Sequence, residues 1–308
     1  MARRTTAFIV VFAAGLLCLG GACSDGTTTD GGSAPDAGAD GGIAQGDASA
    51  DAGVQEDAGA DAGMDAEVTI WTPPPGTTWQ IQFSGALDTT VDVEVYDIDL
   101  FDTPQETIDA LRTAGRKVVC YFSAGSYEDW RPDKGSFKAA DYGKPLENWP
   151  GEWWLDVRSA NVRAIMAARL DLAVQKRCDG VDPDNVDGYQ NDTGFPLTDT
   201  DQEGYLAFLS GAAHGRGLSI GLKNCLGLVD RVADRFEWQL NEECMAYAEC
   251  GLLKPFIDGG RAVFHLEYVS QESEGPARQA EVCGKPEIAG FSTLIKTWDL
   301  SAWRLACP

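Results

Sequence analysis

The feature that most constrains the fold is a regular alternation of strand-like and helix-like segments in the second part of the chain. Eight short stretches have the length and composition of strands, at 79–85, 91–99, 117–125, 180–184, 218–224, 236–242, 262–268 and 292–299. Most of them are separated by segments with helical periodicity. Such alternation is typical of a parallel sheet, and eight units in about 240 residues fit a barrel. The sequence therefore predicts an α/β fold, a (β/α)8 TIM barrel, as its single folded domain.

A doubly wound sheet is the alternative, since it shows the same alternation. Dinucleotide-binding sheets of that kind carry a glycine-rich turn after the first strand, and none follows 79–85. The join between the first two strands is too short for a helix, which is the weak point of the barrel prediction.

Capping and periodicity signals predict where the helices lie. The stretch TPQE, Thr103–Glu106, offers a threonine cap, a proline in the first turn and a glutamate that reaches back, and Gly115 ends that helix. An amphipathic helix is predicted over 159–177 from the spacing of its apolar residues. Further helices are expected near 199–216, 227–234 and 245–258, and a closing helix is expected to hold Trp303 and Leu305.

The start of the chain carries export signals. Arg3 and Arg4 precede the apolar run AFIVVFAAGLLCLG, which is short for a membrane span and predicts a signal peptide over 1–22. The LGGAC that follows resembles a bacterial lipoprotein processing site, although Gly20 stands where a larger aliphatic residue is usual. This favours Cys23 as a lipidated N-terminus, and plain secretion or a retained membrane anchor are the alternatives. Each alternative places the rest of the chain outside the cytoplasm, and lipidation would anchor it to the bacterial envelope or cell surface.

Residues 23–67 are rich in Asp, Gly, Ala, Ser and Thr, with ten acids and no base between Asp25 and Asp65. A segment without an apolar period cannot bury a core, so we expect a disordered tether before a domain over 68–308. The net charge of the whole chain is −24, and subtracting these ten acids together with Arg3 and Arg4 leaves −16 on residues 66–308. An acidic domain is a poor partner for nucleic acid and suits a cationic ligand. We expect a monomer that touches the membrane only through its lipid.

Seven cysteines follow Cys23, and in an exported protein they can pair, with an odd number leaving at least one free. Cys244 and Cys250 can close a short loop, although sequence alone does not prove the pairing. No CxxC motif occurs and the chain has two histidines, His214 and His265, so neither a zinc site nor another cofactor is expected.

Polar side chains gather at the carboxyl ends of the predicted strands, where TIM barrels carry their active sites. These ends supply the candidate residues Asp97, Asp99, Tyr121, Ser123, Asp182, Asp184, Asp187, Lys223, Asn224, Asn241, Glu242, Glu267 and Lys296. The starts of the strands are mostly apolar. Because seven of the eight strands direct polar groups to one rim, the sequence predicts a functional site there.

The candidate set has many carboxylates, amides, lysines and neighbouring aromatics but almost no histidine. Ser-His-Asp hydrolysis needs a histidine base, and His214 and His265 lie in a helix and in mid-strand without a serine elbow, so we expect them to be structural. Glycoside hydrolysis needs only two carboxyl groups, one to donate a proton and one to attack or to activate water. The composition therefore favours a glycosidase.

The stretch CDGVDPDNVDGY, Cys178–Tyr189, raises the question of a calcium loop. With Asp182 at loop position one, position five is Val186, the glycine comes one residue late and position twelve is Thr193 instead of glutamate. The match fails at three places. As the end of a strand, Asp182 and Asp184 share one face, so we expect both to point into the barrel mouth.

Seven motifs together resemble the endo-α-1,4-polygalactosaminidase family, glycoside hydrolase family 114. They are CYFSAGSYEDWRPD, WPGEWWLDV, CDGVDPDNVDGY, GLKN, NEEC, LEY and LIKTWDLSAW, and the resemblance covers residues 70–308. It implies a (β/α)8 barrel that cleaves α-1,4-linked galactosamine polymers. By motif position it implies Asp184 of PDN as the nucleophile and Glu242, the first glutamate of NEEC, as the acid/base.

Strands four and six lie on the same half of a barrel mouth, so we expect their carboxylates about 5–5.5 Å apart, as in a retaining enzyme. The other candidate residues are expected to bind substrate or to tune the local charge, with Lys223 and Lys296 as hydroxyl donors or charge partners. Glu243 should face away from Glu242. The tryptophan-rich segment, 126–157, is expected to divide its tryptophans between sugar platforms and loop core.

De-acetylated galactosamine is a cation, so a cationic amino-sugar polysaccharide is the expected partner of an acidic cleft. Two alternatives stay open. One is a non-catalytic, polysaccharide-binding surface lipoprotein on the same fold, and the other is a related glycosidase that acts on a different amino sugar.

Overall fold

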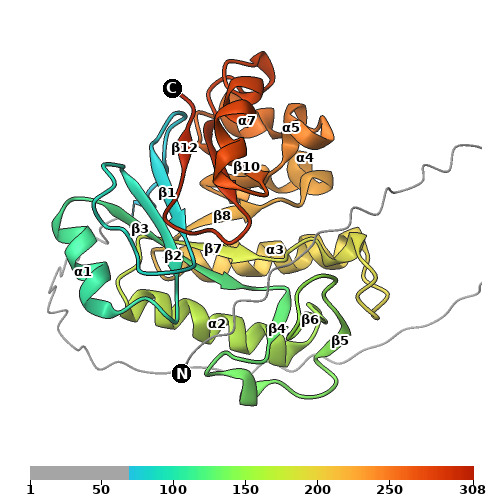
Figure 1. Ribbon diagram of the computed structural model, residues 1–308. Coiled ribbons are helices and arrows are strands. Elements are labelled where there is room, and N and C mark those ends of the chain that lie inside the picture. The colour runs from blue at the N-terminus through green and yellow to red at the C-terminus, as the bar shows by residue number, and fades with distance from the viewer. Residues whose placement is uncertain (1–68) are drawn as a thin grey trace, which may run out of the picture. The chain divides into compact units, whose positions relative to one another are not determined.

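The eight predicted strands form one curled sheet in the order in which they occur along the chain (Figure 1). The computed structural model describes residues 69–308, which lie within one compact unit, Met64–Pro308. The parallel strands are β1 (Trp79–Gln82), β2 (Val95–Asp99), β3 (Lys117–Ser123), β7 (Gly180–Asp184), β8 (Ser219–Lys223), β9 (Trp238–Glu242), β10 (Val263–Val269) and β11 (Ser292–Thr297). Because the strand order never reverses, the TIM-barrel prediction is confirmed and the doubly wound alternative is excluded. The predicted signal peptide, Cys23 and the linker lie outside the described residues.

Side chains connect the two ends of the curled sheet. Trp79 Nε1 donates to the Ser292 carbonyl at 2.8 Å, and Lys296 Nζ donates to the Ile81 carbonyl at 2.9 Å. Residues 83–94, all described, contain no helix between β1 and β2, as the short connection predicted. A last strand, β12 (Leu305–Ala306), pairs antiparallel with β11.

Helices cover the outside of the strands in the described part of the chain. They are α1 (Gln105–Thr113), α2 (Ala160–Gln175), α3 (Asp199–His214), α4 (Val229–Val232), α5 (Cys244–Tyr247), α6 (Lys254–Asp258) and α7 (Gly275–Val282). Short 3-10 turns are η1 (Lys134–Ser136), η2 (Gly188–Gln190), η3 (Leu226–Leu228), η4 (Ala233–Arg235), η5 (Cys250–Leu253), η6 (Glu272–Glu274) and η7 (Pro286–Ile288). Apolar residues of α1, α2 and α3 face the strands β3, β7 and β8, respectively. None of the helices between residues 69 and 308 combines the length and the apolar composition of a membrane span.

Alternate residues of the strands fill the inside of the barrel. The buried cluster there includes Trp79, Ile81, Val95, Val119, Trp238, Leu240, Phe264, Leu266 and Leu294. Gly221 makes room for it, because a Cβ on this residue would stand 2.3 Å from the Trp238 ring. This cluster fills the barrel below the carboxyl ends of the strands, so an open site can form only at the mouth.

Three local predictions are wrong. No side chain caps α1, which begins after Pro104, and the Thr103 carbonyl instead accepts a hydrogen bond from Lys176 Nζ at 2.7 Å. The predicted closing helix is absent from residues 301–308, because a disulfide and the Cys307 N–H bond to the Thr293 carbonyl hold that tail extended along β11. The predicted helix near 245–258 is broken into α5, η5 and α6, with Ala248 at a φ of 58°.

The tryptophan-rich segment contains a small antiparallel sheet beside the barrel, in the order β4 (Ser126–Glu128), β6 (Glu152–Leu155), β5 (Tyr142–Pro145) (Figure 1). Its outer part has an aromatic core, since Tyr127 stacks on Tyr142 with ring centroids 4.6 Å apart and Trp153 packs against both.

Three disulfides join Cys120 to Cys178, Cys244 to Cys250 and Cys283 to Cys307. The predicted short loop between Cys244 and Cys250 is confirmed. Among the described cysteines, Cys225 alone is free, and it is buried.

Candidate active site

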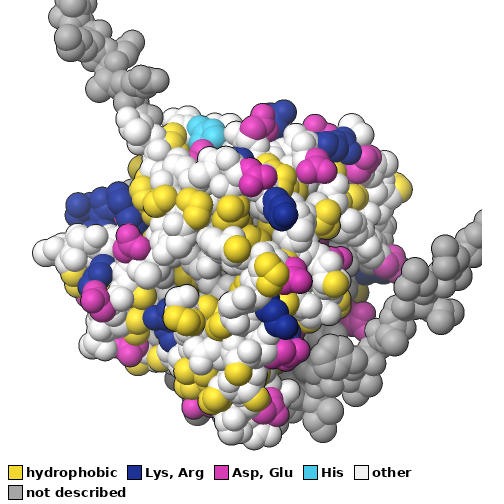
Figure 2. Space-filling view, turned by 90° about the horizontal axis from the view of Figure 1, so that it is seen from above, with side chains coloured by type: hydrophobic (Ala, Val, Ile, Leu, Met, Phe, Trp, Pro, Cys, Tyr) yellow, Lys and Arg dark blue, Asp and Glu magenta, His cyan; other side chains and the backbone are white. Residues whose placement is uncertain are grey.

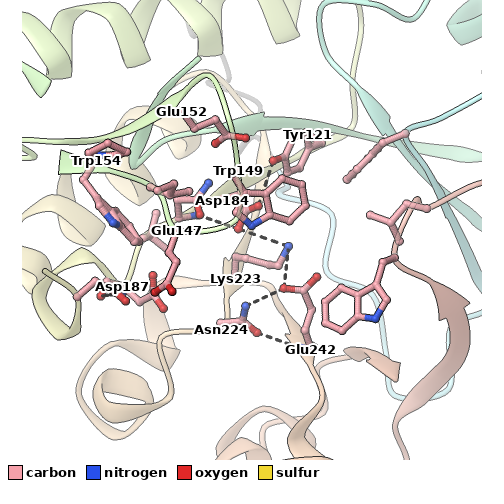
Figure 3. A pocket seen from close by; sticks show the side chains of 18 of the residues that line it. Tyr121, Glu147, Trp149, Glu152, Trp154, Asp184, Asp187, Lys223, Asn224 and Glu242 are labelled. Atoms are coloured by element: carbon pink, nitrogen blue, oxygen red, sulfur yellow. Dashed lines mark hydrogen bonds and ion pairs between the residues drawn. The ribbon is translucent and has the colours of Figure 1, made fainter. Parts of the chain in front are cut away.

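Three charged residues end three neighbouring strands and meet at the mouth of the barrel. Asp184 ends β7, Lys223 ends β8 and Glu242 ends β9. Lys223 Nζ lies 3.4 Å from Asp184 Oδ1 and 3.5 Å from Glu242 Oε2 (Figure 3). The two carboxylates therefore face each other across one ammonium group. Because both distances start from the same nitrogen, their sum is the upper limit for the distance between Asp184 Oδ1 and Glu242 Oε2.

Asp184 is fixed by its neighbours in sequence and by β3. Asn185, in the left-handed region at a φ of 60°, donates its backbone N–H to Asp184 Oδ1 at 2.7 Å. The Tyr121 hydroxyl donates to the other oxygen at 3.0 Å. Gly125 allows the two strand ends to approach, because a Cβ there would stand 1.6 Å from the Asn185 carbonyl oxygen.

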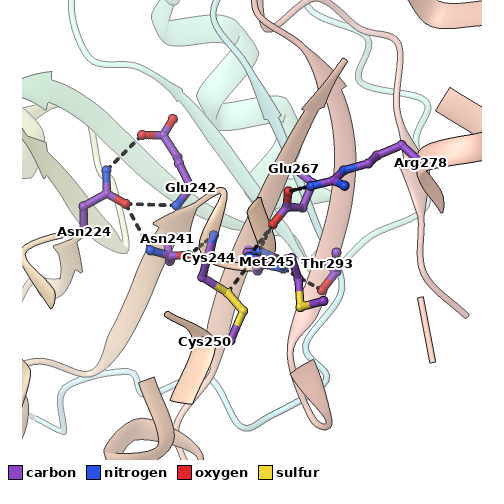
Figure 4. The surroundings of a disulfide bond; sticks show 10 residues. Asn224, Asn241, Glu242, Cys244, Met245, Cys250, Glu267, Arg278 and Thr293 are labelled. Carbon is purple, nitrogen blue, oxygen red and sulfur yellow. Dashed lines mark hydrogen bonds and ion pairs between the residues drawn. A yellow bond between two sulfur atoms is a disulfide. The ribbon is translucent and has the colours of Figure 1, made fainter. Parts of the chain in front are cut away.

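Glu242 has a matching set of donors. The Tyr268 hydroxyl donates to Oε1 at 2.6 Å, and Asn224 Nδ2 donates to Oε2 at 3.0 Å. The Asn224 side-chain oxygen also accepts the Glu242 backbone N–H at 2.9 Å. The Cys244–Cys250 disulfide begins two residues after Glu242 and closes the loop that leaves this strand (Figure 4).

Lys223 is 4% exposed and remains charged. Burial lowers the pKa of this lysine, but the carboxylates of Asp184 and Glu242 outweigh burial and raise the pKa above its ordinary value. A fixed cation between the two acids offsets the negative charge that they bring together at a short separation.

A buried pair of acids, Asp97 and Asp182, lies below this triad and also faces inward. Apart from the interaction of the two carboxyl groups with each other, none of their four oxygens has a hydrogen-bond partner among the described residues. Burial, and then the charge of Asp182, raises the pKa of Asp97 well above its ordinary value. Burial also raises the pKa of Asp182 to about 7. Both shifts favour the protonated form of the pair.

The triad opens into a cleft of about 750 Å³. Its lining comes from the barrel mouth and from the tryptophan-rich segment: Phe83, Tyr121, Lys144, Pro145, Leu146, Glu147, Trp149, Glu152, Trp154, Asp184, Asn185, Val186, Asp187, Asn191, Asp192, Lys223, Asn224, Glu242, Tyr268, Trp298, Asp299 and Leu300. Seven of these residues are acids and two are lysines, so the cleft has an excess of negative charge.

Aromatic rings line the cleft on both sides of the triad. Trp298, 40% exposed, stacks on Tyr268 with ring centroids 4.1 Å apart, and Phe83 packs on Tyr121 at 4.2 Å. Trp154 lines the other side, and Trp149, 55% exposed, lies close to Asp184 in the view of Figure 3. Exposed rings beside carboxylates suit the apolar faces of sugar rings.

Six of the thirteen predicted barrel residues line the cleft: Tyr121, Asp184, Asp187, Lys223, Asn224 and Glu242. The other seven do not: Asp97, Asp99, Ser123, Asp182, Asn241, Glu267 and Lys296. The prediction that this second group lies in the cleft is corrected. Asp97 and Asp182 are buried inside the barrel, below the cleft, whereas the other five bond to neighbouring parts of the chain and do not reach the mouth.

The five residues of this group other than Asp97 and Asp182 each form a hydrogen bond or an ion pair with a neighbouring residue. Asp99 forms an ion pair with Arg131 at 2.8 Å, and Ser123 bonds to Ser126. Asn241 accepts the Cys244 N–H at 3.2 Å. Glu267 lies on the outer face of β10 between His265 and Arg278 (Figure 4), and Lys296 bonds to the Ile81 and Ser301 carbonyls.

Several cleft residues that are not among the thirteen candidates come from the end of β10, from loops and from the tryptophan-rich segment. They are Phe83, Glu147, Glu152, Tyr268, Trp298 and Asp299, together with Trp149 and Trp154, whose division between platform and core the sequence left open. Tyr268 was the detectable case, since it follows Glu267 at a strand end. Glu152 gave no signal of its own.

One cluster of metal-ligating residue types occurs among residues 69–308, formed by Cys244, Cys250 and His265. The two sulfurs are joined in a disulfide, so they do not offer thiolates to a metal. His265 bonds to Glu267 and Thr293 as a structural residue, as predicted.

Comparison with known proteins points in one direction. The model of Glycoside-hydrolase family GH114 matches residues 60–308. The crystal structure of Ega3 from Aspergillus fumigatus in complex with galactosamine is 49% identical, covers 77% of this chain and 97% of its own, and superposes with a TM-score of 0.73. The glycoside hydrolase domain of PelA from Pseudomonas aeruginosa is 13% identical over 74% of this chain and 98% of its own, with a TM-score of 0.59, and supports the fold alone. A search of curated proteins found no match.

Proposed function

The chain belongs to glycoside hydrolase family 114 and is a glycosidase, and from this premise we propose that it cleaves galactosamine-containing polysaccharide at internal α-1,4 linkages. The observation that carries the proposal is the pair Asp184 and Glu242, held by Lys223 in an open acidic cleft. The relative solved with galactosamine supports an amino-sugar substrate. Aromatic rings on both sides of the pair support binding of a polymer across the cleft.

In the proposed mechanism, Asp184 attacks the anomeric carbon while Glu242 gives its proton to the leaving glycosidic oxygen. The glycosidic bond breaks and a sugar–Asp184 ester forms. Glu242 then removes a proton from water, the water oxygen bonds to the anomeric carbon, and Asp184 leaves as a carboxylate. Both residues return to their starting protonation states, and the product keeps the configuration of the substrate.

The geometry supports a retaining reaction. The limit set by the two Lys223 contacts, 3.4 Å and 3.5 Å, includes the retaining separation of about 5–5.5 Å. It overlaps only the lowest part of the range for inverting enzymes, about 6.5–9.5 Å, in which a water must fit between the carboxylates.

The roles of the two carboxylates are tested by Asp184→Asn and Glu242→Gln, each of which we expect to lower kcat on a galactosamine oligomer at least about 100-fold. Azide then separates the roles. With Asp184→Gly, azide should restore turnover and give a glycosyl azide of inverted configuration. With Glu242→Ala, it should give one of retained configuration. The opposite pattern would exchange the roles, and a wild type that binds polymer without releasing reducing ends would favour the non-catalytic alternative.

The N-terminal signals support a place outside the cytoplasm, attached to the bacterial envelope through lipid on Cys23. Fractionation of cells tests this. The wild-type chain should sediment with membranes and incorporate a labelled fatty acid, and Cys23→Ser should do neither. A soluble, unlabelled wild type would support plain secretion.

A further inference from the structure

Glu152 is a cleft carboxylate that the proposed mechanism does not use. It lies in β6 of the small side sheet and is 8% exposed. The Ser126 hydroxyl donates to Glu152 Oε2 at 2.6 Å. Ser126 in turn lies 2.6 Å from the hydroxyl of Ser123, to which Asn185 Nδ2 donates at 3.0 Å. This chain of hydrogen bonds fixes Glu152 relative to the loop that holds Asp184.

The second carboxylate oxygen of Glu152 is free. Oε1 forms no hydrogen bond or ion pair with the described residues, and it is not enclosed, because Glu152 lines the cleft. Figure 3 shows the carboxylate turned toward Tyr121 and Asp184. Burial raises the pKa of Glu152 to about 7, and the charges of Glu128 and Asp184 contribute to this increase. Arg131 opposes this increase, but no cation pairs directly with Glu152, and a nearly enclosed acid near like charges is costly to ionise unless a cation is brought to it.

We propose that Glu152 binds the ammonium group of the galactosamine unit that occupies the cleft beside Asp184. This inference rests on the proposed function and deepens it, because it makes one residue responsible for the choice between free and acetylated amino sugars. An ammonium group donates to Oε1 and neutralises the carboxylate. An N-acetyl group can still donate its N–H, but it carries no charge and therefore cannot neutralise the carboxylate.

The test compares de-acetylated and N-acetylated α-1,4-galactosamine oligomers. The wild type should prefer the de-acetylated oligomer. In Glu152→Gln the amide oxygen can still accept from Ser126, and the amide NH₂ then faces the cleft. We expect kcat/KM on the de-acetylated oligomer to fall about 10- to 100-fold, mainly through KM, because a hydrogen bond to a charged group is lost. The value for the acetylated oligomer should stay within about threefold of wild type.

Glu249→Gln is the control, since it removes one negative charge at an exposed carboxylate that does not line the cleft and has no hydrogen bond in the described structure. We expect it to change the preference less than about threefold. Glu152→Asp retains the charge and should keep part of the preference. Thermal melting establishes that each variant is folded, and if Glu152→Gln does not fold, Ser126→Ala, which releases the carboxylate, should reduce the preference in the same direction.

Binding of the monosaccharides separates this inference from the proposed function. By calorimetry, the wild type should bind galactosamine more tightly than N-acetylgalactosamine, and Glu152→Gln should lose that difference even if neither polymer is cleaved. An equal loss on both oligomers would make Glu152 a hydroxyl-binding or structural residue and overturn the inference. An unchanged preference in Glu152→Gln would also overturn it.

Discussion

At the scale of single residues, Lys223 is the cation that lies between the two proposed catalytic acids. Its ammonium group lies within 3.5 Å of both Asp184 and Glu242. We predict that Lys223→Met lowers kcat at least about 100-fold, because Asp184 attacks as a carboxylate and Lys223 is the cation that stabilises this charge. The loss of positive charge disfavours ionised carboxylates, so the acid limb of the pH–rate profile should move to higher pH.

Lys223→Arg is the matched variant for this prediction. It keeps the charge in a larger, planar group, and should retain more activity than the methionine variant without reaching wild type. If Lys223→Met kept both the wild-type kcat and the wild-type acid limb, Lys223 would only neutralise the rim.

Asp182 gives a second prediction, on stability. Burial is the main reason that its pKa rises from 3.8 in the unfolded chain to about 7, and the carboxylates of Asp184 and Glu242 add to the shift while Lys223 opposes it. The folded chain therefore binds this proton more tightly than the unfolded chain does. The resulting stability is complete below about pH 4 and is lost as the pH rises toward 7.

Asn at this position does not titrate, so Asp182→Asn should be more stable relative to wild type at pH 8 than at pH 5. Urea unfolding at the two pH values measures this difference. Glu147→Gln, an exposed acid, should show the same small difference at both. Parallel pH dependence of Asp182→Asn and wild type would contradict the prediction.

For the candidate site, the sequence was most informative at the ends of the barrel strands. Strand parity correctly placed Asp182 and Asp184 on the inner face, but parity does not give depth, so Asp182 is buried below the cleft that Asp184 reaches. Glu152 could not be predicted, because its position depends on how the tryptophan-rich segment folds back on the barrel. Nothing local distinguishes it from a surface glutamate.

At the scale of elements, we expect the disulfide that contributes most to stability to differ from the one that contributes most to catalysis. They close loops with sequence separations of 58, 24 and 6 residues. In the chain-entropy model the longest is worth about 4 kcal/mol and the shortest about 2 kcal/mol. We predict that replacing Cys120 and Cys178 with Ala lowers the unfolding free energy more than replacing Cys244 and Cys250, as measured by denaturant unfolding.

For kcat we expect the largest effect from the short disulfide, Cys244–Cys250. The Cys244–Cys250 loop directly follows Glu242, and Asn241 accepts the Cys244 N–H. Its removal should lower kcat several-fold in a protein that is still folded, whereas removal of the Cys283–Cys307 bond at the C-terminal tail should leave kcat near wild type. Equal kcat for the two double variants would show that the short disulfide does not position Glu242.

Helix and strand types were predictable where periodicity was long, as for α2 and α3. The errors occur where a distant contact overrides a local signal. Lys176 reaches the Thr103 carbonyl in place of the expected cap, and β11 with a disulfide draws the C-terminal tail into a strand. Local sequence contains neither contact.

At the scale of the whole molecule, the barrel was predictable because the alternation of strand and helix repeats eight times. A wrong boundary in one repeat leaves the number of strands unchanged. The charge was predictable only as a total. On the face shown in Figure 2, acidic and basic side chains are interspersed. In the cleft, seven acids face two lysines. The cleft therefore has a higher proportion of acidic side chains than of basic ones at the place where the proposed reaction occurs.

This excess of acidic side chains predicts how cleavage responds to salt. Screening lengths fall from about 10 Å at 0.1 M to about 3 Å at 1 M, so attraction between the cleft and a polycation weakens while contacts inside it change little. We predict that kcat/KM on the de-acetylated polymer falls several-fold as salt increases from about 0.05 M to about 0.5 M, with kcat nearly constant. The N-acetylated polymer should show a flat response. Any preference for free amines that survives at high salt should disappear in Glu152→Gln, because a nearly enclosed ion pair resists screening. If both polymers responded equally to salt, the cleft charge would not contribute to substrate capture.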